Sequence, residues 1–361
     1  MAADDLRFML RALALAERGA GETNPNPLVG CVIVRSGVVV GEGWHQRAGG
    51  PHAEVIALER AGPRARGATL YVNLEPCVHR AKRTPPCAPV VAAAGLRRVV
   101  VAMRDPNPAV EGRGLDLLRR SGIEVTSGVR TEEARRLNHP FVVAQKRQRP
   151  FVLLKAALSL DGRIATASGE SRWITTAAQR RQARALRRRY DGLLVGIGTV
   201  LSDDPVLLPT PRTQRPFLRV VLDSRLRLPL PSRLVQTARR SPVMVLGLRG
   251  QAPRRRALEA SGVTVLVDPR STGRVSLSWA MGALWRHGLR SLMVEGGSEV
   301  LGSFLAARLV DQVALFRGPL LLGGRGSRPA FGGPDPKHLR DALRLYGPVL
   351  QPFEMWSVAS D

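Results

Sequence analysis

Hydrophobic and polar positions alternate between helical and strand periods along most of this chain. Leu6, Met9, Leu10 and Leu13 recur at helical spacing and predict an amphipathic helix near the start. Two apolar runs, 29–34 and 38–40, flank the turn Ser36-Gly37 and predict a pair of strands. The pattern then predicts helices at 51–61, 87–94 and 114–121 and strands at 68–72, 99–103 and 123–125.

The pattern breaks at the polar segment 145–150, which ends in Pro150, and an apolar strand pattern restarts at 151–154. Further strands are predicted at 193–195, 218–222, 243–248, 263–267, 292–294 and 313–316, with helices at 177–189, 254–260 and 279–287. Alternation of strands and helices predicts α/β architecture. We therefore expect two α/β domains, residues 1–146 and residues 150–361.

Composition agrees with two folded domains in the cytoplasm. The 361 residues, 44% of them hydrophobic, are long for one domain and sufficient for two cores. No apolar run is long enough to cross a membrane, and Asp4, Asp5 and Glu17 argue against a signal peptide. The three cysteines are too few and too sparse for a disulfide framework. Cys31, in an apolar run, is expected to be a small buried hydrophobic residue.

The formal net charge of +26 invites a nucleic-acid interpretation. However, the positive residues are almost all arginine, acidic residues are interspersed among them, and aromatic residues make up only 4% of the chain. Arginine-rich sites bind phosphorylated small molecules equally well. We therefore expect a phosphorylated small-molecule substrate rather than nucleic acid.

A histidine and two cysteines carry the most specific chemistry in the first domain. His52 precedes Ala53-Glu54, Cys77 follows Glu75-Pro76, and Cys87 follows Thr84-Pro85-Pro86. One imidazole and two thiolates can hold one Zn²⁺ ion and leave a fourth position for water. Glu54, two residues after the histidine, is placed to shuttle protons. H-x-E followed by P-C and a second cysteine is the zinc-deaminase pattern.

In the second domain, polar and glycine residues follow predicted strands. Lys155 follows the strand at 151–154, the segment 196–199 follows the strand at 193–195, and the segment 295–298 follows the strand at 292–294. Ligands of α/β proteins bind at such strand ends, and glycines there let a phosphate approach helix N–H groups. Three such turns favour a nucleotide cofactor, although none is a complete dinucleotide fingerprint. Arg187, at the end of the arginine-rich helix, is a candidate phosphate clamp.

Longer motifs extend over nearly the whole chain, at 24–34, 41–45, 51–54, 74–77, 83–87, 105–108, 159–163, 168–175 and 199–205. In these motifs the chain resembles the bifunctional deaminase-reductases of riboflavin biosynthesis. The resemblance implies a cytidine-deaminase-like first domain and a dihydrofolate-reductase-like second domain. The first would remove an amino group from a phosphoribosylated diaminopyrimidinone, and the second would use NADPH to reduce the ribosyl group to a ribityl chain.

The same resemblance assigns roles to individual residues. His52, Cys77 and Cys87 would bind zinc, Glu54 would be catalytic, and Asn26 and His45 would line the pyrimidine pocket. The reductase substrate would contact Ser171, Arg187, Leu207 and Glu295. NADPH would contact Ala157, Trp173, Thr199, Asp203, Ser224, Gly296, Gly297 and Ser298. The family also implies a homo-oligomer, a dimer or larger.

Two departures from the family pattern leave alternatives open. The loop 78–83 between the cysteines is one residue longer than usual and lacks a glycine, so a working reductase with an impaired deaminase is one alternative. An arginine expected soon after Pro205 is out of register, and Arg212 is a candidate replacement. A nucleic-acid-binding, deaminase-like protein is the other alternative, for which strongly salt-dependent binding would be evidence.

Overall fold

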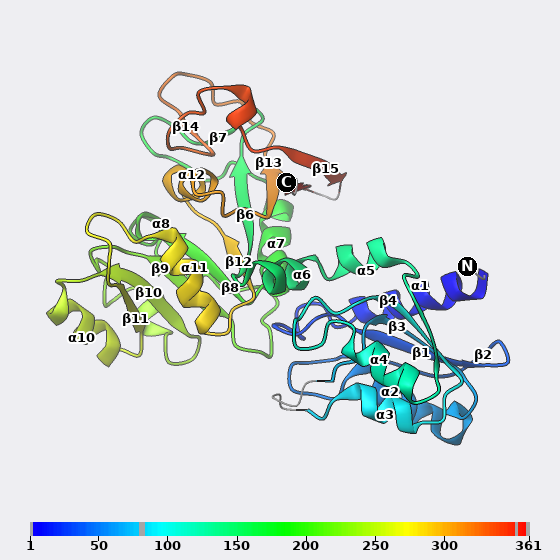
Figure 1. The fold of residues 1–361 in the computed structure, drawn as a ribbon. Helices are drawn as coiled ribbons and strands as arrows, with labels where there is room; N and C mark the ends of the chain where they lie inside the picture. Colours follow the sequence, from blue (N-terminus) through cyan, green and yellow to red (C-terminus); the bar gives the residue numbers. More distant parts are fainter. Residues whose placement is uncertain (1–2, 79–83, 351–352, 359–361) are drawn as a thin grey trace. The chain divides into compact units, whose positions relative to one another are not determined.

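A computed structural model describes residues 3–78, 84–350 and 353–358. The chain divides into two compact units, Met1–Arg147 and Gln148–Asp361, each built around its own sheet (Figure 1). In the described residues no helix is long and apolar enough to cross a membrane.

The first unit has a five-stranded sheet with the order β2-β1-β3-β4-β5. β1 is antiparallel to β2 and β3, whereas β3, β4 and β5 run parallel. The strands are β1 (Gly30–Arg35), β2 (Val38–Trp44), β3 (Thr69–Leu74), β4 (Arg98–Met103) and β5 (Glu124–Ser127). The helices are α1 (Ala3–Glu17), α2 (Ala53–Ala61), α3 (Cys87–Ala93), α4 (Arg113–Arg120), α5 (Thr131–Leu137) and α6 (His139–Arg147), with a 3₁₀ turn at Gly62–Ala65.

Alternate residues of the central strands face two helical layers, because successive strand side chains point to opposite faces. Cys31 and Ile33 of β1 pack in a core with α2, α3 and α4. Val32 and Val34 of the same strand pack in a second core with α1 and α5. Cys31 is fully buried, as expected. The sheet is therefore the middle layer of three.

The second unit has a nine-stranded sheet with the order β11-β10-β9-β8-β12-β6-β13-β16-β15. The strands from β11 to β13 are parallel, and β16 and β15 add an antiparallel edge. The sheet strands are β6 (Phe151–Leu158), β8 (Gly192–Gly196), β9 (Leu218–Leu222), β10 (Val243–Leu248), β11 (Thr264–Asp268), β12 (Ser291–Val294), β13 (Gln312–Arg317), β15 (Leu345–Leu350) and β16 (Glu354–Val358). A small two-stranded sheet pairs β7 (Arg163–Ala165) with β14 (Arg328–Pro329).

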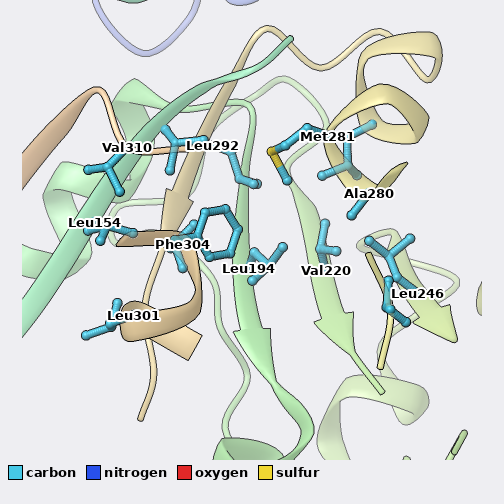
Figure 2. Packing of buried hydrophobic residues seen from close by; sticks show 14 of the residues in the cluster. Leu154, Leu194, Val220, Leu246, Ala280, Met281, Leu292, Leu301, Phe304 and Val310 are labelled. Carbon is cyan, nitrogen blue, oxygen red and sulfur yellow. The ribbon is translucent and has the colours of Figure 1, made fainter. Parts of the chain in front are cut away.

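One face of the large sheet is covered by α11 and α12. Figure 2 shows side chains of the parallel strands packed together with residues of these helices. The labelled strand residues include Leu154, Leu194, Val220, Leu246 and Leu292, and the helix residues are Ala280, Met281, Leu301 and Phe304. The helices of this unit are α7 (Ala177–Leu186), α8 (Ile197–Asp203), α9 (Arg233–Gln236), α10 (Ala252–Ala260), α11 (Leu277–Arg286) and α12 (Ser298–Ala306), with 3₁₀ turns at Arg187–Arg189 and Leu339–Asp341. This packing holds the strands whose ends carry the candidate reductase site.

The predicted helices and strands are present with shifted bounds, and several short elements, among them strands β7, β14, β15 and β16, were not predicted. Leu10 was expected on the buried face of the first helix, but it is 45% exposed, while Phe8 and Ala12 are buried. Lys155 was expected after its strand, but β6 continues to Leu158 and Lys155 lies within it. The helical segment 177–189 ends as a 3₁₀ turn from Arg187 onwards. Helices α5, α6, α8 and α9 were not predicted, because their short segments lack a clear apolar stripe.

Candidate active sites

His52, Cys77 and Cys87 come together in the first unit, with their ligand atoms all within 4.8 Å of one another. His52 is the residue before α2, Cys77 follows β3 by three residues, and Cys87 opens α3. Both cysteines are buried and form no disulfide. The prediction that ligands stand at the starts of two helices is confirmed. Helix N-termini place N–H donors near thiolates, and the Cys87 amide donates to Cys77 Sγ at 3.4 Å.

The donor set fits a zinc ion. His52 Nδ1 lies 3.6 Å from Cys77 Sγ and 3.1 Å from Cys87 Sγ. Tetrahedral zinc with ordinary bond lengths separates a nitrogen ligand from a sulfur ligand by about 3.6 Å. His52 Nε2, on the other side of the ring, is 3.1 Å from Thr84 Oγ1. A proton on Nε2 that is donated to Thr84 leaves the lone pair of Nδ1 directed at the thiols.

Two further predicted residues adjoin this cluster. The rings of His45 and His52 meet edge to face, with centroids 5.2 Å apart. His45 Nδ1 is 3.0 Å from the Pro51 carbonyl oxygen, so Nδ1 carries the proton. Asn26 Nδ2 then donates to His45 Nε2 at 3.1 Å. This neutral histidine and its amide partner give the pocket polar groups without adding charge beside the metal ligands.

Glu54 lies in the first turn of α2 and is 3% exposed. Burial and the charge of Glu54 together raise the pKa of Cys31, so Cys31 remains a neutral thiol beside the carboxylate. The chain thus brings the expected proton carrier and the three metal ligands to the ends of α2, α3 and β3. The longer loop at 79–83 lies outside the described residues.

Glu75 supports the site structurally, a role that was not predicted from the sequence. Its buried carboxylate accepts backbone N–H groups from Asp105, Gly112, Gly114 and Leu115, at 2.9 to 3.3 Å. Negative charge near a helix N-terminus is stabilising, and the last three of these amides lie at the start of α4. Glu75 therefore anchors α4 to the chain two residues before Cys77. The sequence signal for this anchor is a glutamate that directly follows an apolar strand, in the motif Glu75-Pro76-Cys77.

In the second unit, the candidate residues gather at one edge of the large sheet. The strands β9, β8, β12 and β6 are parallel neighbours, so their carboxyl ends lie on the same side. Ser224 follows β9, Thr199 lies just beyond β8, and Glu295 follows β12. Ala157 is the second-to-last residue of β6. The edge is the usual ligand-binding position of an open α/β sheet.

A partly buried ion pair joins two predicted substrate residues. Arg187 donates from Nε and Nη2 to the two Glu295 carboxylate oxygens, each at 2.9 Å, and from Nη1 to the Leu208 carbonyl at 3.0 Å. Burial raises the pKa of Glu295, but the charges of Arg187 and Lys155 outweigh it and lower the value to about 2. Burial lowers the pKa of Lys155, partly offset by Glu295. The site thus holds a fixed anion and a lysine that gives up its proton more easily than usual.

The turn after β12 is shaped for a close approach. Gly296 has φ +133°, a conformation that other residues rarely adopt, and a Cβ there would lie 3.2 Å from Thr199 Oγ1. Thr199, on α8, therefore lies against this turn, and Gly297 and Ser298 begin α12 directly afterwards. The Ser224 hydroxyl accepts the Val275 N–H at 3.2 Å, which fixes its orientation.

Trp173 is exposed over 65% of its surface and lies against two arginines. The Arg180 guanidinium is 4.2 Å and the Arg172 guanidinium 5.8 Å from its ring centroid. Arg172 also pairs with Asp203 at 2.7 Å. Ser171, Trp173 and Asp203 are thereby brought to one place by Arg172, although no sequence motif links 171–173 to 203.

Leu207, the remaining substrate residue, lines a cavity of about 490 Å³ with Arg187. Segment 205–210 forms one wall, and Arg184, Arg212 and Arg233 also line it. Arg212, proposed above as the replacement for the out-of-register arginine, is thus on the same cavity as Leu207. Arg184 and Arg233 were missed as lining residues, because their sequence surroundings are typical of exposed helix faces.

Comparison with known families covers both units. Residues 2–103 match the cytidine and deoxycytidylate deaminase zinc-binding region, and residues 150–348 match the RibD C-terminal domain. The chain is 41% identical over 341 residues to the riboflavin biosynthesis protein RibD of Actinobacillus pleuropneumoniae, covering 94% of this chain and 90% of that protein. It is 44% identical over 333 residues to RibD of Escherichia coli K12, covering 88% and 89%.

Solved structures agree over the full length. RibD of Acinetobacter baumannii has a TM-score of 0.87 at 37% identity, covering 99% of each chain. A diaminohydroxyphosphoribosylaminopyrimidine deaminase/5-amino-6-(5-phosphoribosylamino)uracil reductase of Thermotoga maritima has a TM-score of 0.83 at 33% identity, again over 99% of each chain. The predicted fold class, two α/β domains with a deaminase-like domain first, is confirmed. The likeness of the second domain to dihydrofolate reductase stays a prediction.

Proposed function

Because this chain belongs to the RibD family of bifunctional deaminase-reductases in riboflavin biosynthesis, we propose how its residues divide the two reactions. Zinc-dependent deamination is assigned to residues 1–146 and NADPH-dependent reduction to residues 150–361. The first reaction takes 2,5-diamino-6-(5-phosphoribosylamino)pyrimidin-4(3H)-one. The second takes its product, 5-amino-6-(5-phosphoribosylamino)uracil. The His52, Cys77 and Cys87 cluster is the observation that carries the first assignment.

In the deaminase, zinc held by His52 Nδ1 and the two cysteine sulfurs would lower the pKa of a bound water. Glu54 would take a proton from that water as its oxygen attacks the carbon that bears the 2-amino group. The same carboxylate would return the proton to the departing nitrogen, which leaves as ammonia. Asn26 and His45 would hold the pyrimidine, since both offer neutral polar groups beside the cluster.

In the reductase, the cyclic ribosylamine must open before it can accept hydride. The bond from C1′ to the ring oxygen breaks, the ring oxygen gains a proton, and the nitrogen, which keeps its own proton, forms a protonated imine with C1′. NADPH, when bound, would supply the hydride to C1′, which leaves a neutral amine on a ribityl chain. Lys155, with a pKa lowered by burial, would supply the proton, and Glu295, fixed by Arg187, would orient the sugar.

In the reductase, substrate and NADPH would bind along the carboxyl ends of the parallel strands of the large sheet. Ser171, Arg187, Leu207 and Glu295 would contact the substrate. NADPH would lie along the turns that carry Ala157, Trp173, Thr199, Asp203, Ser224, Gly296, Gly297 and Ser298. The support for this course is that Ala157 lies near the end of β6, and that Thr199, Ser224 and residues 296–298 follow the neighbouring parallel strands β8, β9 and β12. We further propose a cytoplasmic homo-oligomer, a dimer or larger, which light scattering during size-exclusion chromatography tests.

Two variants, each expected to lose one activity and keep the other, test the assignment of the two reactions. Glu54→Gln should lose ammonia release from the diaminopyrimidinone at least 1,000-fold, because the proton carrier is gone, while NADPH oxidation with supplied deaminated intermediate persists. Glu295→Gln should show the reverse. Zinc content of the Glu54→Gln protein, measured by mass spectrometry, should equal that of wild type. Loss of both activities in either variant would contradict the assignment, as would ammonia release without a need for Glu54.

A further inference from the structure

A buried arginine in the second unit has no carboxylate partner. Arg219 lies near the start of β9 and is 0% exposed. Within the described part of the chain, no acidic side chain forms an ion pair with it, and its Nε has no hydrogen-bond acceptor. Burial, and after it the charge of Arg212, lower its pKa to about 10. Burying an unpaired charge is costly, so stability alone does not explain an arginine here.

The side chain of Arg219 instead ties two segments together. Its Nη1 donates to the Val206 carbonyl at 3.0 Å and to Thr237 Oγ1 at 2.8 Å. Its Nη2 donates to the carbonyls of Thr237 and Ser241. Val206 belongs to the cavity wall, and Thr237 ends α9. The planar fork of a guanidinium suits this arrangement, because its donors point to two segments at fixed angles.

The other end of α9 is attached to the same wall. The Asp204 carboxylate accepts the Arg233 N–H at 2.9 Å, at the start of α9. Arg233 lines the cavity, so α9 carries a positive charge to it. Asp204 and Arg219 thus hold segment 204–206 to the first residue of this short helix and to the residue that caps its C-terminus.

The wall itself is held in a conformation that needs such support. Asp204 has φ 40° and Leu207 has φ 58°, left-handed values that a leucine rarely adopts. Such residues persist only where their surroundings determine them, and they concentrate at ligand sites. The Leu208 carbonyl accepts from Arg187, and Thr210 N–H donates to the Arg184 carbonyl. Arg219 is therefore one of several ties that fix Leu207 against the cavity.

The cavity that this wall lines is strongly positive. Four arginines line it, namely Arg184, Arg187, Arg212 and Arg233. Of these, only Arg187 forms an ion pair with a carboxylate among the residues that the structure describes. Arg219 adds a further positive charge behind the wall. It lies close enough to Arg212 for the charge of Arg212 to lower the pKa of Arg219. A dianionic phosphate is the chemical group that such a cavity favours.

We propose that Arg219 is a positioning residue of the reductase, which sets the affinity for the substrate phosphate by holding wall 204–210 and α9 in place. The inference rests on the reductase function proposed above. Arg219 touches neither substrate nor cofactor in this scheme. It acts through the Val206 carbonyl and through the helix that carries Arg233.

Arg219→Met tests the proposal, since methionine keeps an unbranched side chain but cannot donate. We expect the KM for 5-amino-6-(5-phosphoribosylamino)uracil to rise about tenfold or more, with kcat within threefold and the KM for NADPH unchanged. Inhibition by inorganic phosphate should weaken by a similar factor. Hydrogen exchange of the amides in segment 204–210 should become faster. Arg219→Lys keeps the charge but loses the fork, and it should also raise KM.

Arg290→Met is the matched control. Arg290 is a partly buried arginine that donates to the carbonyls of Trp285 and Leu289, at the opposite end of β12 from Glu295. The Arg290→Met substitution should lower thermal stability without changing the KM for 5-amino-6-(5-phosphoribosylamino)uracil. If Arg219→Met fails to fold, Asp204→Asn, which weakens the other tie to α9, should raise the same KM.

Several outcomes would overturn the proposal. One is an Arg219→Met enzyme that unfolds at lower temperature but keeps its substrate KM within twofold. Another is full recovery of KM in Arg219→Lys, which would make the charge and not the fork responsible. Failure of the proposed function is distinguishable, because the wild-type protein would then not oxidise NADPH with this substrate.

Discussion

At the scale of single residues, Thr84 contacts a candidate metal ligand, His52, in a way that its sequence position does not reveal. Its hydroxyl lies 3.1 Å from His52 Nε2, while His52 Nδ1 faces both thiols. A partner that fixes the tautomer and ring orientation of a histidine ligand typically contributes 10- to 100-fold to metal affinity. The motif Thr84-Pro85-Pro86-Cys87 predicted that this segment belongs to the metal site. The contact between residues 52 and 84 was not predictable, because neither periodicity nor motif spacing connects these two positions.

Thr84→Val should therefore weaken zinc binding about 10- to 100-fold, because valine keeps the shape of threonine but cannot accept the Nε2 proton. Competition against a chromophoric zinc chelator measures this affinity. Thr84→Ser keeps the hydroxyl and should bind zinc nearly as tightly as wild type. Equal zinc affinity in wild type and Thr84→Val would show that the tautomer is fixed by something else.

At the scale of elements, the order of strands and helices was predictable, and the contacts between them were not. The strands at 218–222 and 243–248 were predicted at the bounds of β9 and β10, because buried parallel strands are continuous apolar runs. The metal ligands were predictable as well, because their spacing is distinctive. The anchoring of α4 by Glu75 was not, since it joins segments 30 to 40 residues apart. Leu10 was wrongly assigned to the buried face of α1, because residues on the adjacent face of a helix recur at the same spacing.

The start of α4 provides a prediction at this scale. A Cβ on Gly114 would lie 2.1 Å from the Pro76 carbonyl oxygen, the residue before Cys77. Alanine usually stabilises a helix relative to glycine by about 1 kcal/mol. Gly114→Ala should instead destabilise the first unit by roughly 1 to 3 kcal/mol and weaken zinc binding, because backbone beside Cys77 must move.

Urea unfolding and the zinc competition measure the two effects of Gly114→Ala. Gly273→Ala is the control, because a Cβ there meets no atom within 4 Å and its φ is not in the left-handed region. It should leave both measurements unchanged. Stabilisation by Gly114→Ala would mean that the close approach of α4 to Pro76 is not a tight constraint.

At the scale of the whole molecule, the two chemistries are carried by separate units. The metal ligands and Glu54 lie in Met1–Arg147, and the residues assigned to NADPH lie in Gln148–Asp361. Each unit has its own sheet and its own buried core. Metal binding stabilises the folded state of the unit that binds it. Removing zinc is therefore expected to act on one half of the protein.

Dialysis of the full-length enzyme against a strong chelator should abolish ammonia release and lower the unfolding temperature of the first unit. NADPH oxidation with supplied 5-amino-6-(5-phosphoribosylamino)uracil should remain within twofold, because the one metal-ligand cluster among the described residues lies in the first unit. Differential scanning calorimetry should then show one transition moved and one unchanged, and added zinc should restore both ammonia release and the first transition. A parallel loss of NADPH oxidation on chelation, restored by zinc, would instead mean that folding or activity of the reductase depends on the deaminase unit.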